Sequence, residues 1–254
     1  MTENVQSAMS RKSSAANEFV EIIKTVVYAL LIALVLRVLF FQPFTIPSAS
    51  MEPNLYEGDY IIVSKFSYGY SRHSMPWSPK LFEGRVLENT PKRGDVVVFK
   101  LPRDGRTDYV KRVIGLPGDR IQMKSGLLYL NGVQVPRTAA MIPSIEAEYT
   151  AQRFSENLPQ GRSFMTQDYG TNGDLDNTDQ YVVPEGHYFM MGDNRDNSMD
   201  SRVPPAEDGV GFVPAENLVG KAQMILLSWY PGASIFKPWT WVLEARPSRF
   251  FKAL

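Results

Sequence analysis

The sequence contains no cysteine and only two histidines in 254 residues. Without cysteine, disulfides, thiol nucleophiles, cysteine-based zinc sites and iron-sulfur clusters are excluded. Every histidine-dependent chemistry would rest on His73 and His187. An excess of one charge is also missing, since Lys plus Arg and Asp plus Glu both number 27. A nucleic-acid binder needs a broad cationic field, so we expect no nucleic-acid partner.

One long apolar run lies near the N-terminus. It extends from Thr25 to Phe41, and Arg37 alone interrupts it. A membrane-spanning helix needs about 20 mostly apolar residues, so we predict one transmembrane helix over 18–42 after a polar tail over 1–17. A buried core helix is the alternative, but the segment is apolar on all sides.

The residues around this run favour a retained anchor over a cleavable export signal. Ala49 follows the run but has Pro47 two positions before it, so a small-x-small cleavage site is missing. Arg11, Lys12 and Lys24 precede the run, which favours a cytoplasmic N-terminus and export of everything that follows the span.

Short β-type runs separated by Gly, Pro and Asp follow the apolar segment. Strand-like runs lie at 60–63, 95–100 and 109–114. Asn131 and Gly132 stand between two further β-rich runs, and this dipeptide predicts a tight hairpin turn.

A polar, turn-rich stretch over 136–180 interrupts this pattern before strand-like residues return. We therefore predict an inserted, smaller unit over 122–181, and a main domain formed by 43–121 and 182–254. The tail over 228–254 gathers three of the four tryptophans with phenylalanine and basic residues. This mixture suits a membrane interface, and aromatic core packing is the alternative.

Ser48 and Ser50 lie between Pro47 and Pro53, directly after the apolar run. Prolines stiffen a loop, and a serine nucleophile must be held in a fixed orientation. A polar turn without chemistry is the alternative interpretation of this segment.

Lys111 lies in the middle of a predicted strand, on the same face as Tyr109 and Val113. If that face is buried, the ammonium is desolvated, which lowers the lysine pKa and allows the amine to act as a general base. A solvated strand lysine is the alternative.

The polar segment over 191–202 follows an apolar run and is too turn-prone to be a core element. Loops of this kind often orient catalytic groups. Ser198, Asp200 and Arg202 are candidates to support a lysine base and to hold the loop through an internal ion pair. A calcium loop is the alternative, but Arg195 and Arg202 oppose it, and an EF-hand needs a glutamate at its twelfth position.

In order and wording, these segments resemble the signature boxes of bacterial type I signal peptidases. The matching segments are PSASMEP after a membrane anchor, GDVVVFK, DYVKRVIGLPGD, and GDNRDNSMDSR followed by GFVP. The resemblance spans roughly residues 19–235. It implies a mostly β fold, in which an antiparallel β catalytic domain carries an inserted β-rich subdomain and follows one transmembrane helix. The sequence departs from many members at Ala49, where glycine is common, and in a longer stretch over 203–210.

The resemblance implies a membrane-bound serine endopeptidase that cleaves N-terminal signal peptides from exported preproteins after small residues at the −3 and −1 positions. Ser50 matches the nucleophile and Lys111 the general base. Ser48 matches the residue whose hydroxyl helps the oxyanion hole, and Ser198 matches the residue that hydrogen-bonds the lysine. Asp193, Asp200 and Arg202 match supporting positions. The matching substrate-binding positions are Phe44, Ile46, Pro47, Met51, Leu55, Ile61, Val98, Asp108, Tyr109 and Val110.

The resemblance implies neither a cofactor nor a metal. The partners that it implies are signal peptides of exported preproteins and membrane lipid, with the protein-export channel nearby. The implied location is the bacterial inner membrane, with a single span and the catalytic domain on the exported side.

Three other functions stay open at this point. A Ser/His/Asp hydrolase would use His187, which is close in sequence to the polar loop. A self-cleaving repressor-like protease would also use serine and lysine, but the membrane span opposes it. A membrane-tethered binding module without chemistry is opposed by the intact Ser50 and Lys111.

Overall fold

The computed structural model describes residues 2–75, 78–79, 82–140, 151–233 and 237–254, with the backbone only over 2–16. The chain forms two compact units, Met1–Phe40 and Phe41–Leu254, and each is described by itself.

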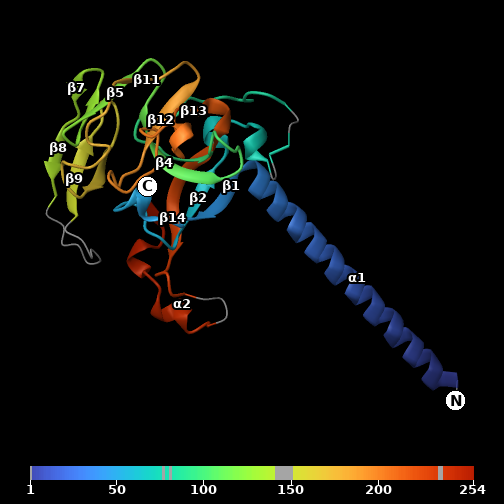
Figure 1. Ribbon diagram of the computed structural model, residues 1–254. Helices are drawn as coiled ribbons and strands as arrows, with labels where there is room; N and C mark the ends of the chain where they lie inside the picture. Colours follow the sequence, from blue (N-terminus) through green and yellow to red (C-terminus); the bar gives the residue numbers. More distant parts are fainter. Residues whose placement is uncertain (1, 76–77, 80–81, 141–150, 234–236) are drawn as a thin grey trace. The chain divides into compact units, whose positions relative to one another are not determined.

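The first unit is helical, with α1 spanning Thr2–Leu39 (Figure 1). Its part from Asn17 to Leu39 has a mean hydropathy of 2.4, is not buried, and is long and apolar enough to cross a membrane. The predicted apolar helix is therefore present, but its bounds differ from 18–42. The polar residues predicted as a tail continue the same helix, and Phe41 already begins the first strand.

The second unit is built on one antiparallel sheet in the order β1-β2-β14-β3-β4-β12-β13, with β15 paired to β14. The predicted runs at 60–63, 95–100 and 109–114 lie in β2, β3 and β4. The bounds are β1 Phe41–Thr45, β2 Asp59–Ser64, β3 Val96–Lys100, β4 Asp108–Gly115, β12 His187–Met191, β13 Val213–Pro214, β14 Leu218–Ser228 and β15 Lys252–Ala253. Short 3-10 helices connect these strands: η1 Ala49–Met51, η2 Phe66–Tyr68, η3 Arg72–Ser74, η4 Pro205–Glu207, η5 Ala215–Asn217 and η6 Pro247–Arg249.

Two small antiparallel sheets, gathered at one end of this unit, form from residues between β4 and β12 (Figure 1). One has the order β11-β5-β6-β7 and the other β10-β9-β8. Asn131 and Gly132 join β6 to β7 with φ of 54° and 82°, as a two-residue hairpin turn requires, so that prediction is confirmed. The bounds are β5 Arg120–Lys124, β6 Leu127–Leu130, β7 Val133–Gln134, β8 Arg137–Ala139, β9 Gln152–Asn157, β10 Ser163–Asp168 and β11 Tyr181–Val182.

These two sheets coincide closely with the predicted insertion over 122–181. Because 41–254 form one compact unit, the division into a catalytic domain and a separate subdomain stays a prediction. Part of the insertion, 141–150, lies outside the described residues.

The core is double-sided because both faces of β3 are covered. Val96 and Val98 pack into one apolar cluster with Ile61 and Ile225, whereas Val97 and Phe99 pack into another. Successive strand residues point to opposite faces, so a run of four apolar residues fills two cores. β3 thereby fixes the neighbouring β4, which carries Lys111 opposite Val97.

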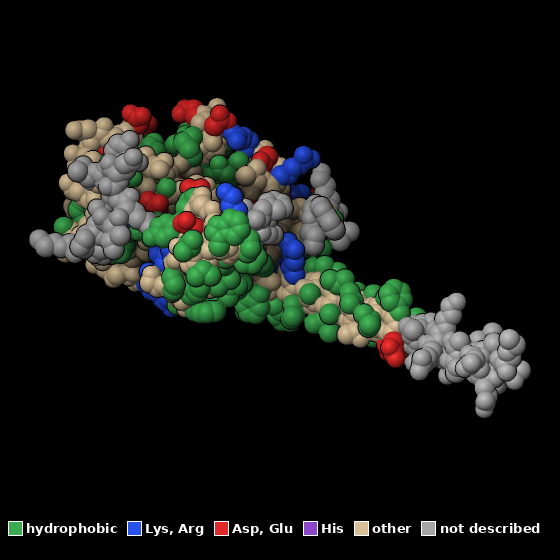
Figure 2. Space-filling view, turned by 90° about the horizontal axis from the view of Figure 1, so that it is seen from below, with side chains coloured by type: hydrophobic (Ala, Val, Ile, Leu, Met, Phe, Trp, Pro, Cys, Tyr) green, Lys and Arg blue, Asp and Glu red, His purple; other side chains and the backbone are tan. Residues whose placement is uncertain are grey.

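The C-terminal tail carries an exposed apolar turn at α2 (Thr240–Leu243). Trp239, Trp241, Val242 and Leu243 are 61%, 49%, 81% and 73% exposed, so aromatic core packing does not hold for this part of the tail. Figure 2 shows hydrophobic side chains gathered on the face seen from below, where α2 lies.

Candidate active site

The segment that carries Ser48 and Ser50 connects β1 to β2 and turns through η1. Ser48 precedes the turn in an extended conformation, with φ of −149° and ψ of 156°. Met51 anchors the turn, because its side chain is 1% exposed and its carbonyl accepts the Leu55 N–H at 2.9 Å. Ser50 therefore projects from a fixed backbone, with its side chain half-buried.

The loop after β12 holds the same turn from a second direction. The Asn194 N–H donates to the Ser50 carbonyl at 3.1 Å, and the Asn194 side-chain amide donates to the Ala49 carbonyl at 3.2 Å. The two segments pack so closely that a Cβ on Gly192 would lie 2.5 Å from the Ser50 carbonyl oxygen. A residue with a side chain does not fit at this position.

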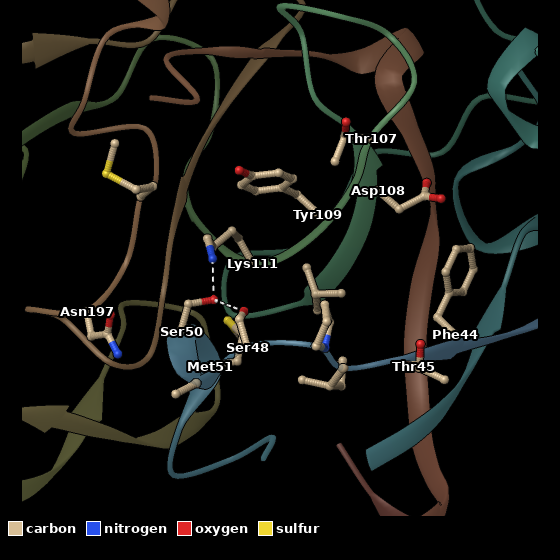
Figure 3. Close-up of a pocket in the computed structure, with 15 residues that line it drawn as sticks. Phe44, Thr45, Ser48, Ser50, Met51, Thr107, Asp108, Tyr109, Lys111 and Asn197 are labelled. Carbon is tan, nitrogen blue, oxygen red and sulfur yellow. Dashed lines mark hydrogen bonds between the residues drawn. The ribbon is translucent and has the colours of Figure 1, made fainter. Parts of the chain in front are cut away.

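Lys111 comes from β4 and points at Ser50 (Figure 3). Its Nζ donates a hydrogen bond of 2.5 Å to Ser50 Oγ. The Lys111 side chain is 3% exposed, and burial lowers its pKa to about 8. The carboxylates of Asp200 and Asp193 oppose this shift, and the Arg202 guanidinium adds to it. Desolvation is thus the main reason that this amine is a competent base near neutral pH.

The two other serines expected at the site lie close to Ser50. Ser48 Oγ is exposed and 3.4 Å from Ser50 Oγ. Ser198 Oγ is buried next to Gly192, where a Cβ would lie 2.2 Å from it. Among the described contacts, Lys111 Nζ donates a hydrogen bond to Ser50 Oγ and none to Ser198 Oγ. The expected hydrogen bond between Ser198 and the lysine is therefore not formed in this structure.

The supporting residues of the polar loop form buried ion pairs. Asp193 accepts two hydrogen bonds of 2.7 Å from Arg112, and a third of 2.8 Å from Asn54. Asp200 and Arg202 are fully buried and joined by two bonds of 2.9 Å, so the predicted internal ion pair is present. The Arg202 partner lowers the pKa of Asp200 against the effect of burial. These pairs fix the loop without help from solvent.

The small β8-β9-β10 sheet also holds this loop. Glu156 on β9 and Arg195 are both 1% exposed and share bonds of 2.9 and 2.6 Å. Gln167 on β10 donates its N–H to the Asp193 carbonyl and accepts the Arg195 N–H, each at 2.8 Å. The role of this region was open from the sequence; the structure shows that part of it holds the polar loop over 191–202.

A pocket of about 660 Å³ opens beside the Ser50–Lys111 pair. Most of the predicted substrate-binding residues line it: Phe44, Ile46, Pro47, Met51, Asp108, Tyr109 and Val110. The other three, Leu55, Ile61 and Val98, are fully buried in the apolar core and do not line it. They belong to the same buried core cluster as the pocket residues Ile46 and Met51, so they lie behind the wall of the pocket.

Comparison with known proteins identifies the family. Residues 19–229 match the family model described as signal peptidase, peptidase S26. The chain belongs to this signal peptidase family. It is 39% identical over 264 residues to a signal peptidase I of Rickettsia typhi, covering 97% of this chain and 98% of the relative. It is 41% identical to a signal peptidase I of Rickettsia prowazekii, covering 89% of this chain and 90% of the relative.

A solved structure of a signal peptidase I from Enterococcus faecalis is also similar, with 29% identity and a TM-score of 0.31. The matched region covers 52% of this chain and 97% of the Enterococcus faecalis chain. Membership of the signal peptidase family makes the chain a serine endopeptidase that acts on signal peptides. The predicted family, mostly antiparallel β fold and enzyme class are confirmed.

Sequence reasoning missed several pocket residues of this signal peptidase family member. Thr45 is the last residue of β1, and Thr107 comes directly before β4. Each is next to a predicted pocket residue in the sequence, and that adjacency was the available signal. Asn197 and Met199 come from the polar loop. Figure 3 shows Asn197 on the far side of Lys111 from Phe44.

The histidines do not contribute to this site. His187 Nδ1 contacts the Glu185 carbonyl at 2.8 Å, and His73 Nδ1 contacts Ser78 Oγ at 3.0 Å. Neither lines the pocket that holds Ser50, so the Ser/His/Asp alternative lacks its base. Within the described ranges, no three His, Asp or Glu side chains gather as metal ligands would.

Proposed function

We propose that the chain is a membrane-anchored endopeptidase that uses Ser50 as nucleophile and Lys111 as general base. The observation that carries this proposal is the 2.5 Å bond between Lys111 Nζ and Ser50 Oγ, at a lysine that burial brings to a pKa of about 8. A serine hydroxyl is a weak nucleophile until an adjacent base removes its proton. Lys111 is the one basic side chain in contact with Ser50 Oγ among the described residues.

The reaction is acyl transfer in two steps. Ser50 Oγ attacks the carbonyl of the residue before the cut, and the neutral Lys111 amine takes its proton and passes it to the leaving amine. The negative charge on the carbonyl oxygen is stabilised by the Ser50 N–H and the Ser48 hydroxyl, and losing one such donor typically costs about 3 kcal/mol. Water then attacks the Ser50 ester with Lys111 again as base, which releases the signal peptide and restores the enzyme.

The pocket supports selectivity for small residues at the −3 and −1 positions. Phe44, Ile46, Met51, Tyr109 and Val110 give the pocket beside Ser50 an apolar lining. A short apolar side chain such as Ala fits against these groups, whereas a charged side chain would lose its hydration without a partner.

Membrane anchorage and lipid contact are supported by two separate features. The apolar part of α1 is long enough to span a bilayer, and α2 exposes Trp239 and Trp241 beside aliphatic residues. Tryptophan and aliphatic side chains at a surface suit the headgroup region of a membrane. We therefore propose a single-pass protein of the bacterial inner membrane, with its catalytic unit on the exported side, where the export channel delivers preproteins.

The orientation follows from lysine and arginine before the span. The side chains of Arg11 and Lys12, on which this prediction mainly rests, lie outside the described residues. Lys24 pairs with Glu21 at 2.9 Å on the exposed surface of the helix.

The test is cleavage of a preprotein with an Ala-x-Ala site by the full chain in detergent. Three variants are compared: Ser50→Ala, Lys111→Met and, as the control for a histidine base, His187→Ala. We expect cleavage after the second Ala by the unaltered chain and by His187→Ala, and none by the other two. Full activity of Lys111→Met would show that Lys111 is not the general base. Inactivity of a folded, unaltered chain would favour the membrane-tethered binding module.

A further inference from the structure

A second cleft, of about 480 Å³, lies behind the catalytic strand. Lys111 and Arg112 are neighbours on β4 and point to opposite faces. Lys111 lines the substrate pocket, and Arg112 lines this cleft together with β3, β14, β15 and the β9–β10 hairpin. The two cavities share no lining residue among those described. The cleft is therefore a separate site and not an extension of the substrate pocket.

The cleft is rich in cations. Three of its basic side chains form ion pairs: Arg112 with Asp193, Arg93 with Asp119, and Lys221 with Asp95. These three pairs are internally neutral, and they serve the fold.

Three further basic residues line the cleft without such a partner. Among the described side chains, Lys92, Arg162 and Lys252 form no ion pair with any carboxylate. All three side chains are exposed. Partial burial and the nearby Arg249 lower the pKa of Lys252, whereas Asp59 raises it. Asp95 also lines the cleft, but it is paired with Lys221. A cleft lined mainly by cations concentrates anions.

The floor of the cleft is apolar. Val96 and Phe164 are buried, and Leu254 packs partly buried against the same core that contains Val96. The Arg112 guanidinium lies 4.1 Å from the centre of the Phe164 ring, which covers that ring from one side. A ligand that fits both features has a multiply charged anionic head and a small apolar remainder.

We propose that this cleft is a binding site for a phosphate-bearing ligand, held by Lys92, Arg162 and Lys252. Three cations without an ion-pair partner around one cleft favour a ligand with more than one negative charge over a single carboxylate. A phosphate monoester carries about −1.5 to −2 charges at neutral pH and presents three strong acceptor oxygens. Arginine binds such oxygens through two parallel N–H bonds, and lysine adds point charge. The head could come from a phospholipid or from a soluble phosphate compound.

The test is isothermal titration of the full chain, in nonionic detergent at low salt, with inorganic pyrophosphate as the probe. The variant Arg162→Gln/Lys252→Gln removes two cleft charges. The matched control, Arg120→Gln/Lys124→Gln, removes one arginine and one lysine on β5, outside the cleft. We expect the cleft variant to bind pyrophosphate at least tenfold more weakly, and the control to stay within twofold of the unaltered chain.

Two more probes decide the chemistry and its source. Dihexanoyl phosphatidic acid that binds more tightly than pyrophosphate, and loses affinity in the cleft variant, assigns the head to a lipid; weaker binding assigns it to a soluble phosphate. A hexaglutamate peptide that binds as tightly as pyrophosphate overturns the phosphate assignment. The site itself is refuted if the unaltered chain does not bind pyrophosphate, or if both double variants bind it equally. Because Ser50 and Lys111 are unchanged in both, cleavage activity reports separately on the proposed function.

Discussion

Lowering the pH below 8 should slow cleavage about tenfold per pH unit, because Lys111 accepts the Ser50 proton only as a neutral amine. Burial lowers the Lys111 pKa from 10.5 to about 8. At pH 7 the neutral fraction is then roughly one tenth, whereas an ordinary lysine would be neutral in roughly one molecule in 3,000. The buried position thus raises the reactive fraction roughly 300-fold at pH 7.

The assay is kcat/KM for an internally quenched signal-peptide substrate, measured with the full chain in detergent from pH 6 to 10. This parameter reports the pKa of the free enzyme. We expect a single rise that levels above pH 8. A midpoint near 6.5 would indicate a histidine base, and a midpoint near 10.5 would show that Lys111 is solvated, so either result refutes the reasoning.

The same pKa has an effect on stability that does not depend on catalysis. Since the folded-state pKa lies below the unfolded one, stability is lost as pH falls from 10.5 to about 8, and the loss is complete below that range. The cost at pH 7 is about 3 kcal/mol. Lys111→Met removes this buried charge, so urea unfolding at pH 7 should show a more stable chain. A Met variant that is less stable at pH 7 than the unaltered chain would contradict the assigned cost.

Three further predictions concern the catalytic loop and the topology. Glu156→Ala leaves the Arg195 guanidinium buried without its partner, which should lower the free energy of unfolding by about 3 to 5 kcal/mol in urea titrations; an unchanged midpoint would show that the pair is not needed. Gly192→Ala pushes a Cβ against the Ser50 carbonyl and should lower kcat/KM about 100-fold with retained secondary structure by circular dichroism; a fully active variant would argue against this tight packing. Val133→Cys places the one thiol of the chain at a hairpin residue that is 69% exposed, so an impermeant maleimide should label it from the exported side. Labelling only after lysis would indicate the opposite orientation in the membrane.

Local patterns made most of the fold predictable. The β-branched runs of β2, β3 and β4, and the Asn131-Gly132 turn, depend on residues that are close in the sequence, so they could be located without long-range information. The bounds of α1 were harder, because the polar residues after Thr2 carry no apolar stripe that would distinguish helix from tail.

The site was predictable only in part. Ser50 and Lys111 were named from their segments and from the family resemblance, but their distance and the burial of the amine depend on the packing of η1 against β4. Glu156 and Arg195 are far apart in the sequence, and polar residues are normally expected at the solvent-exposed surface. Their buried ion pair was therefore not predictable from the sequence. Leu55, Ile61 and Val98 were named as substrate-binding positions from the family resemblance, and they lie in the core instead. Strand patterns alone do not show which face of the core opens to a cavity.

Trapping of the acyl-enzyme tests the central claim most directly. The full chain is mixed with excess peptide carrying an Ala-x-Ala site, quenched in acid within one turnover, digested and examined by mass spectrometry. We expect the N-terminal part of the substrate to be attached to Ser50, and no adduct with Lys111→Met, because the unassisted hydroxyl does not attack. An adduct on another residue, or an adduct on Ser50 formed at an unchanged rate in Lys111→Met, would contradict the proposed Ser50–Lys111 mechanism.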